Sequence, residues 1–150
     1  MASTARIFSS VSIDRQLRAA LVRRLTVDHA ERPFSPGDPR ETVVRVGRHL
    51  GDLGLQAVRI RGTVTVTGVE VDHVWLAVGS PGTDGWVLDA SLPLREPAFV
   101  GALAGYVAGM ISGAELAAAA LGMGIEQRVL GVFPPSATYR GQPYWSTRSN

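Results

Sequence analysis

The feature that most constrains the fold is an alternating pattern of apolar residues over 57–78. Residues 57–66 place Val58, Ile60, Val64 and Val66 on one side of a strand. Residues 69–78 continue with the same period and place Val69, Val71, His73, Trp75 and Ala77 on one face. Because strand side chains alternate between two faces, and because Gly68 permits a turn between the segments, the sequence predicts an antiparallel hairpin.

A third strand is predicted over residues 86–92, after a loop at 79–85 that is rich in glycine and other turn-forming residues. The three strands would form an antiparallel meander. Residues 125–132 are predicted as a short edge strand. The two chain ends, residues 1–11 and 140–150, are predicted to be loosely ordered.

Helical spacing of apolar residues flanks the β region on both sides. It predicts helices over residues 13–26, 39–53, 97–109 and 113–121. Ser12 suits the N-cap of the first helix, and Pro39 suits the first turn of the second. Ser112 and Glu115 fit a capping box at the start of the last. The fold class that follows is α+β, with a small antiparallel sheet packed on the helix over 43–53 and further helices near the C-terminus.

The composition limits the chemistry that the chain can perform. Its 150 residues suit a single domain. The sequence contains no cysteine, which excludes disulfides, thiolate chemistry and cysteine-ligated metal sites. All 15 basic residues are arginine, a usage typical of bacterial genes with a high GC content. The net charge of only +2 argues against nucleic acid as the partner.

The sequence predicts no membrane span. The N-terminus lacks the apolar segment of a secretory signal. The long apolar stretch from Phe99 to Leu121 is interrupted by Ser112, Gly113 and Glu115, so it predicts two short helices in place of one spanning helix. We therefore expect a cytoplasmic protein without a membrane partner.

Three ionisable residues stand out because they interrupt apolar strands. Asp72 and His73 lie within the second predicted strand, and Asp89 lies within the third. Adjacent antiparallel strands can bring His73 and Asp89 side by side, where a carboxylate fixes the tautomer of an imidazole and stabilises its charged form. Two interpretations stay open: a catalytic acid–base pair, or a half-buried histidine that is satisfied by its neighbour.

The other histidines, His29 and His49, are assigned no role. Three scattered histidines do not form a metal-ligand pattern, so no metal and no cofactor are expected. A mixed site of aspartate and histidine ligands is the alternative.

The order of the predicted elements carries a family resemblance. A helix begins after a glycine-containing loop and ends in Leu53-Gly-Leu-Gln-Ala-Val-Arg; a strand follows, then His73-Val-Trp, a turn and Trp86-Val-Leu-Asp. Over about residues 35–92 this resembles the transglutaminase-like branch of the papain-like superfamily. The resemblance implies a transglutaminase-like core in which His73 and Asp89 match the second and third catalytic positions.

The first catalytic position of that family is missing. The resemblance implies a nucleophilic cysteine near Pro39 or Arg40, at a helix N-terminus, and the chain has none. Ser35 and Thr42 carry hydroxyls nearby, but an unactivated hydroxyl is a far weaker nucleophile than a thiolate. The resemblance therefore implies a retained fold with lost or altered chemistry, as in a pseudoenzyme.

Asp38 is a third candidate site residue because it precedes the same predicted helix. The amides at a helix N-terminus favour a negative charge, so we expect Asp38 or a bound anion in the place of the cysteine, facing His73. Asp38, His73 and Asp89 would then line one cleft as an acid–base or metal-binding set.

Three functions from different classes are compatible with the sequence. The preferred one is a cysteine-less transglutaminase-like protein that binds a small molecule or a protein partner, with an exposed patch of Tyr139, Tyr144 and Trp145 as one candidate surface. The second is a small hydrolase or cyclase that uses His73 with Asp89 and no thiol. The third is a phosphate or nucleic-acid binder. The arginines of that third function would be Arg15, Arg18, Arg23, Arg24, Arg59 and Arg61.

Overall fold

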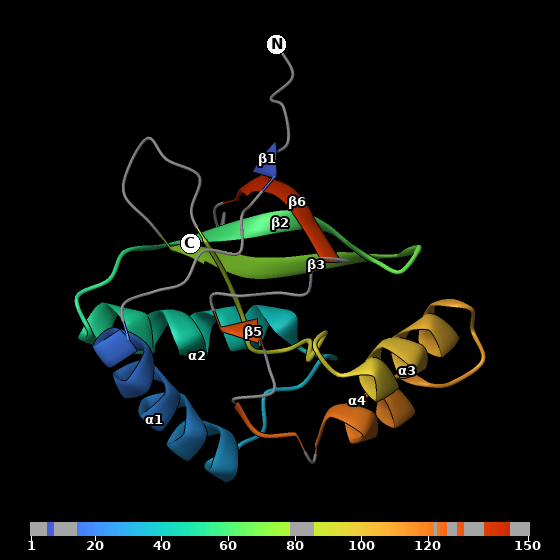
Figure 1. The fold of residues 1–150 in the computed structure, drawn as a ribbon, viewed down its shortest axis with the longest axis horizontal. Coiled ribbons are helices and arrows are strands. Elements are labelled where there is room, and N and C mark those ends of the chain that lie inside the picture. Colours follow the sequence, from blue (N-terminus) through green and yellow to red (C-terminus); the bar gives the residue numbers. More distant parts are fainter. Residues whose placement is uncertain are drawn as a thin grey trace.

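The computed structural model describes residues 6–7, 15–78, 86–121, 123–125, 129–130 and 137–144. The helices are α1 (Arg15–Glu31), α2 (Pro39–Asp52), α3 (Pro97–Val107) and α4 (Gly113–Leu121). The strands are β1 (Arg6–Ile7), β2 (Ala57–Val66), β3 (Val69–Val78), β4 (Trp86–Asp89), β5 (Val129–Leu130) and β6 (Ala137–Pro143). This combination of an antiparallel sheet with helices confirms the α+β class (Figure 1).

The strands form one antiparallel sheet in the order β1-β6-β2-β3-β4-β5. The long central pair, β2 and β3, is the predicted hairpin (Figure 1). Thr67 and Gly68 join its strands with φ angles of 48° and 80°. Positive φ at both central residues is what a type I′ turn requires, and this turn matches the twist of the flanking strands.

The two faces of the sheet are covered by different helices. In β3, Val74, Leu76 and Val78 pack with α1 and α2, whereas Trp75 and Ala77 pack with α3 and α4. Figure 1 shows α1 beside α2 and α3 beside α4, with the two pairs apart from each other. The second half of β3 is therefore buried on both faces, which explains why its sequence changes from alternating to continuously apolar.

Helix ends follow the predicted local chemistry. α2 begins at Pro39, and Oδ1 of Asp38 accepts a hydrogen bond of 3.2 Å from the backbone N–H of Glu41. The capping box of α4 is confirmed, because Ser112 and Glu115 exchange side-chain-to-backbone hydrogen bonds of 3.1 Å in both directions.

Within the described ranges, no helix combines the length and the hydropathy that crossing a bilayer would need.

Two predicted element ends are wrong by three residues or more, whereas α2 and α3 end one and two residues before their predicted ends. The third strand stops at Asp89 instead of Leu92, because the carboxylate of Asp89 accepts a hydrogen bond of 3.0 Å from the backbone N–H of Ser91. Such a local side-chain bond turns the chain away from the ladder. The first helix continues to Glu31 instead of ending near residue 26, since its last turns pack against α2.

Residues 140–150 were predicted to be loosely ordered, and this prediction is wrong for residues 140–143. Residues 137–143 form β6, which pairs with β2 over its whole length. Within the N-terminal segment that was predicted to be loose, Arg6–Ile7 form β1 on the outer edge of β6. Residues 1–5, 8–11 and 145–150 lie outside the described residues, and the predicted edge strand over 125–132 is seen as β5 only.

Two glycines allow β6 to pack closely on β2. Gly62 and Gly141 are opposite each other in this pair. A Cβ on Gly62 would overlap the carbonyl oxygen of Arg140, and one on Gly141 would lie 2.5 Å from the carbonyl oxygen of Arg61. The missing side chains therefore let β6 bring Tyr139 and its neighbours to the centre of the sheet.

We expect Gly62→Ala to lower the free energy of unfolding by about 2–3 kcal/mol, because the added methyl group meets backbone that cannot rotate away. Gly47→Ala is the matched control, since Gly47 lies in α2 with open space at its Cβ position. It should raise stability by about 0.5–1 kcal/mol through helix propensity. Urea unfolding of both variants measures the difference, and equal stabilities would contradict the close approach of β2 and β6.

Candidate functional site

The predicted pair of His73 and Asp89 is formed, and it is buried. Nε2 of His73 lies 2.9 Å from Oδ2 of Asp89, and each side chain is 2% exposed. The register that sets Ala77 opposite Val87 puts both side chains on the face of the sheet that packs with α3 and α4. The pairing predicted from the two strands is therefore confirmed.

Two further side chains complete what we call the Asp89 cluster: His73, Asp89, Ser91 and Tyr139. The hydroxyl of Tyr139 donates to Oδ2 of Asp89 at 2.8 Å. Ser91 donates to Oδ1 from its backbone N–H at 3.0 Å and from its hydroxyl at 2.9 Å. The carboxylate thus receives donors from β3, from the turn after β4, and from β6.

These donors hold Asp89 in its charged form. Burial raises the pKa of Asp89, but the charge and hydrogen bond of His73 and the bonds from Tyr139 and Ser91 outweigh it, so this pKa lies below the usual carboxyl range. Burial and the adjacent carboxylate raise the pKa of Tyr139 well above its usual value. Asp89 is therefore a buried negative charge enclosed by the donors of the cluster.

The contacts within the cluster differ from those of a catalytic triad. In a triad, the hydroxyl and the carboxylate contact opposite nitrogens of the imidazole. Here the hydroxyl of Ser91 lies 3.3 Å from the same Nε2 that contacts Asp89, and it donates to Asp89. Ser91 is 1% exposed, so this arrangement offers no accessible nucleophile.

Aromatic rings pack around the cluster. The ring of His73 stacks with Trp75 at 6.2 Å between centroids, and Trp75 meets Tyr139 edge to face at 5.1 Å. Tyr139 is fully buried, which corrects its predicted place in an exposed aromatic patch. Tyr144 is half-buried, and Trp145 lies outside the described residues.

Asp38 does not join His73 and Asp89. Its carboxylate caps α2, as expected for a negative charge at a helix N-terminus, but α2 packs on the opposite face of the sheet from the His73 ring. The nearby hydroxyls also serve the local backbone: Ser35 accepts from Gly37, and Thr42 donates to the carbonyl of Asp38. In the described part of the chain, no three acidic or histidine side chains are grouped to hold a metal ion.

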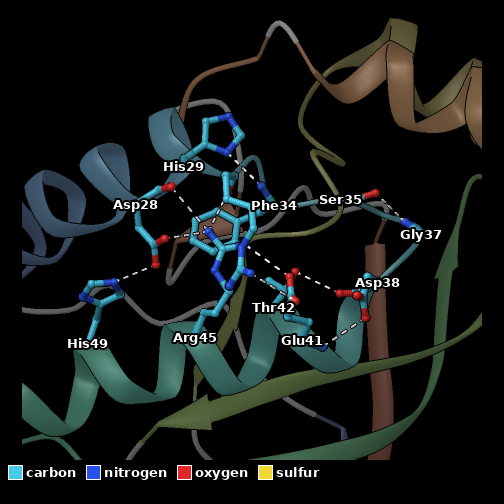
Figure 2. A network of polar contacts seen from close by, with 11 residues as sticks. Asp28, His29, Phe34, Ser35, Gly37, Asp38, Glu41, Thr42, Arg45 and His49 are labelled. Atoms are coloured by element: carbon cyan, nitrogen blue, oxygen red, sulfur yellow. Dashed lines mark hydrogen bonds and ion pairs between the residues drawn. The ribbon is translucent and has the colours of Figure 1, made fainter.

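A second polar network fixes the start of α2 (Figure 2). Arg45 of α2 is 4% exposed, and its guanidinium lies 4.2 Å above the ring of Phe34. The same guanidinium donates hydrogen bonds to the carboxylate of Asp28 at 2.7 Å and to the backbone carbonyl of Arg32 at 2.6 Å. His49 contacts the other oxygen of Asp28 at 2.9 Å. α1, the 32–38 loop and α2 are thereby tied together, which sets where Pro39 begins the helix.

The histidines without a predicted role belong to this region. His29 accepts a hydrogen bond of 3.1 Å from the N–H of Phe34 and stacks on its ring, so it shapes the loop before α2.

Burial raises the pKa of Asp28, but hydrogen bonds from Arg45 and His49 outweigh it, so this pKa lies below its usual value.

In the described part of the chain, an open hollow surface lies on the α2 side of the sheet. Three open hollows of about 340–350 Å³ each adjoin there and share Thr63. We call this surface the sheet trough. Its side chains come from the start of α2 and from alternate positions of β2, β3 and β6: Arg40, Arg61, Thr63, Thr65, Glu70, Asp72, Thr138, Arg140 and Gln142.

The charged side chains of the trough are exposed and not paired. Arg40, Arg61 and Arg140 make no ion pair or side-chain hydrogen bond with any described residue, and neither do Glu70 and Asp72. Some arginines elsewhere are paired, since Arg24 contacts Asp52 and Arg45 contacts Asp28, whereas Arg48 is exposed and unpaired among the described residues. The trough thus presents charges that are free to contact a ligand.

The sequence predicts only part of the trough. Arg61 is a predicted anion-binding residue and Asp72 interrupts an apolar strand, but Arg140 falls in a segment that is predicted to be loosely ordered. Pairing of β6 with β2 brings Arg140 opposite Thr63. Alternation over 137–143, with Ala137, Tyr139 and Gly141 on one side, is the signal that could have found this strand.

No protein-family model matches the chain, and no curated protein or solved structure matches it either. The resemblance to transglutaminase-like proteins therefore stays a prediction.

We expect Tyr139→Phe to lower the free energy of unfolding at pH 7 by about 2 kcal/mol, because it removes a hydrogen bond to a buried charge. Tyr144→Phe is the control, since the hydroxyl of Tyr144 bonds to no described residue. It should change stability by less than about 0.5 kcal/mol. Chemical unfolding compares the two, and an equal loss would show that Tyr139 contributes packing alone.

Stability should also depend on pH at both extremes. Because the pKa of Asp89 is lowered by folding, its stabilising contribution is present above about pH 4 and is lost as the pH falls through the folded pKa. Because the pKa of Tyr139 is raised, its contribution is lost as the pH rises above about 10, where the unfolded chain releases this proton first.

Unfolding free energies across the pH range test this expectation. Tyr139→Phe should flatten the alkaline side, and Asp28→Asn should separate the contribution of Asp28 from that of Asp89 on the acid side. An alkaline side that is unchanged in Tyr139→Phe would contradict the assignment.

Proposed function

We propose that the chain is a binding protein on a transglutaminase-like core without the nucleophilic cysteine, and that its ligand occupies the sheet trough. The observation that carries this proposal is the separation of two polar regions. The Asp89 cluster is enclosed, whereas the arginines of the trough are exposed, unpaired among the described residues, and line open hollows. A general acid–base needs contact with its substrate. His73 borders one hollow of the trough, but its side chain is only 2% exposed and packs beside Trp75 on the other face of the sheet.

The position of the trough agrees with the place that the resemblance gives to the cysteine, although the His73 ring packs on the other face of the sheet. The resemblance puts the missing cysteine near Pro39 or Arg40, and both residues border the trough at the start of α2. A ligand there would lie where the resemblance places the chemistry of a transglutaminase-like enzyme, without a thiol to react with it. This supports a pseudoenzyme that has kept a binding surface.

The test is an NMR screen of the isotope-labelled chain against small neutral, anionic, cationic and zwitterionic compounds. We expect the largest shifts in the amides of Arg61, Thr63 and Arg140, with no compound converted. Arg61→Ser should weaken these responses by about fivefold or more, since it removes a charged contact.

Arg48→Ser, on an exposed position of α2 outside the trough, is the control and should leave the responses unchanged. Responses that persist in Arg61→Ser and map to α3 and α4 would place the ligand elsewhere. Conversion of a compound that is lost in His73→Gln would favour the enzyme alternative.

A further inference from the structure

The charges of the sheet trough are sorted by strand. Thr63 of β2 is opposite Arg140 of β6 on one side and Asp72 of β3 on the other. Thr65 is likewise opposite Glu70 of β3. Thr63 and Thr65 therefore form a floor between Arg140, the one charged residue of β6, and the two carboxylates of β3. We call Arg140 the basic wall, and Asp72 with Glu70 the acidic wall.

The two walls are too far apart for backbone contact and leave room between them. Neighbouring strands lie about 4.8 Å apart, so β6 and β3 are separated by about 10 Å across β2. Arg140 and Asp72 face this gap without an ion pair to each other or to another residue of the described part. Arg40 and Arg61 add positive charge at the end next to α2.

This distribution favours one class of ligand over another. A polyanion such as a nucleic acid or polyphosphate would meet the carboxylates of Asp72 and Glu70, whose repulsion opposes binding. A molecule with an ammonium group at one end and a carboxylate at the other satisfies both walls. Threonine hydroxyls on the floor can donate to or accept from amide groups between those ends.

We infer that the sheet trough binds a short zwitterionic peptide, with its carboxylate on the arginine side and its ammonium group at Asp72. An extended peptide spans about 3.4 Å per residue, so two or three residues bridge the gap. This inference rests on the proposed binding function and names the ligand class of the same site.

The experiment titrates the labelled chain with glycine, diglycine, triglycine and pentaglycine, followed by NMR. Diglycine or triglycine should bind most tightly. N-acetyl-triglycine, which lacks the ammonium group, and triglycine amide, which lacks the carboxylate, should each bind about fivefold or more weakly.

Matched variants assign the two ends. Asp72→Asn should remove the preference for triglycine over its N-acetyl form, and Arg140→Gln should remove the preference for triglycine over its amide. Glu31→Gln and Arg48→Gln, both on exposed helix positions outside the trough, should keep both preferences.

Other outcomes overturn the inference and show which part has failed. Tighter binding of N-acetyl-triglycine, with competition by inorganic phosphate, would make the trough an anion site. Failure of every glycine peptide, while other compounds still shift Thr63, would reject the peptide class and leave the binding function intact. If no compound of any charge shifts the trough, the binding function itself is wrong.

Discussion

The sheet depends on one buried carboxylate. Taking the charge of Asp89 out of water is costly unless hydrogen-bond donors surround it. The donors belong to His73, Ser91 and Tyr139, which lie on β3, after β4 and on β6. Apolar packing tolerates small shifts between strands, whereas charge-assisted hydrogen bonds hold their partners at defined positions. Satisfying this single charge therefore fixes how β3, β4 and β6 lie relative to one another.

On the open face of the sheet, α2 is shorter than the strand that it covers. α2 has 14 residues and β3 has 10, which correspond to about 21 Å of helix and about 33 Å of strand. Even if it ran parallel to the strand, the helix would leave about 12 Å of sheet uncovered on its side. The uncovered positions, such as Thr63 and Asp72, carry polar side chains, while the opposite face is closed around Trp75 and Tyr139. The open trough thus lies on the part of the strands that extends beyond the start of α2.

Much of this arrangement could be predicted from short-range patterns. Alternation predicted the β2–β3 hairpin, and two polar residues in apolar strands predicted the contact of His73 with Asp89. The side of the sheet on which that contact lies could not be predicted, because residues 74–78 are apolar on both faces and either helix pair could have covered the ring. The contacts of Ser91 and Tyr139 with Asp89 could not be predicted, for different reasons. Ser91 bonds to Asp89 through a turn that ends the strand earlier than expected, and Tyr139 lies 50 residues from Asp89 in the sequence. The position of Asp38 at the start of its helix was predicted correctly. Its predicted position beside His73 was wrong, because the sequence does not tell which face of the sheet this helix covers.

The place of β6 in the sheet has a consequence for synthesis. It is the last described strand in chain order, yet it lies between β1 and β2 and supplies both Tyr139 to the closed face and Arg140 to the open one. On the ribosome, the central hairpin emerges long before β6, and a nascent chain that stops short of residue 137 has neither the final donor to Asp89 nor the basic wall. Because long-range strand pairing forms late and slowly, the sheet closes and the trough appears in one step. Ligand capture would then be confined to chains in which β6 has paired with β2.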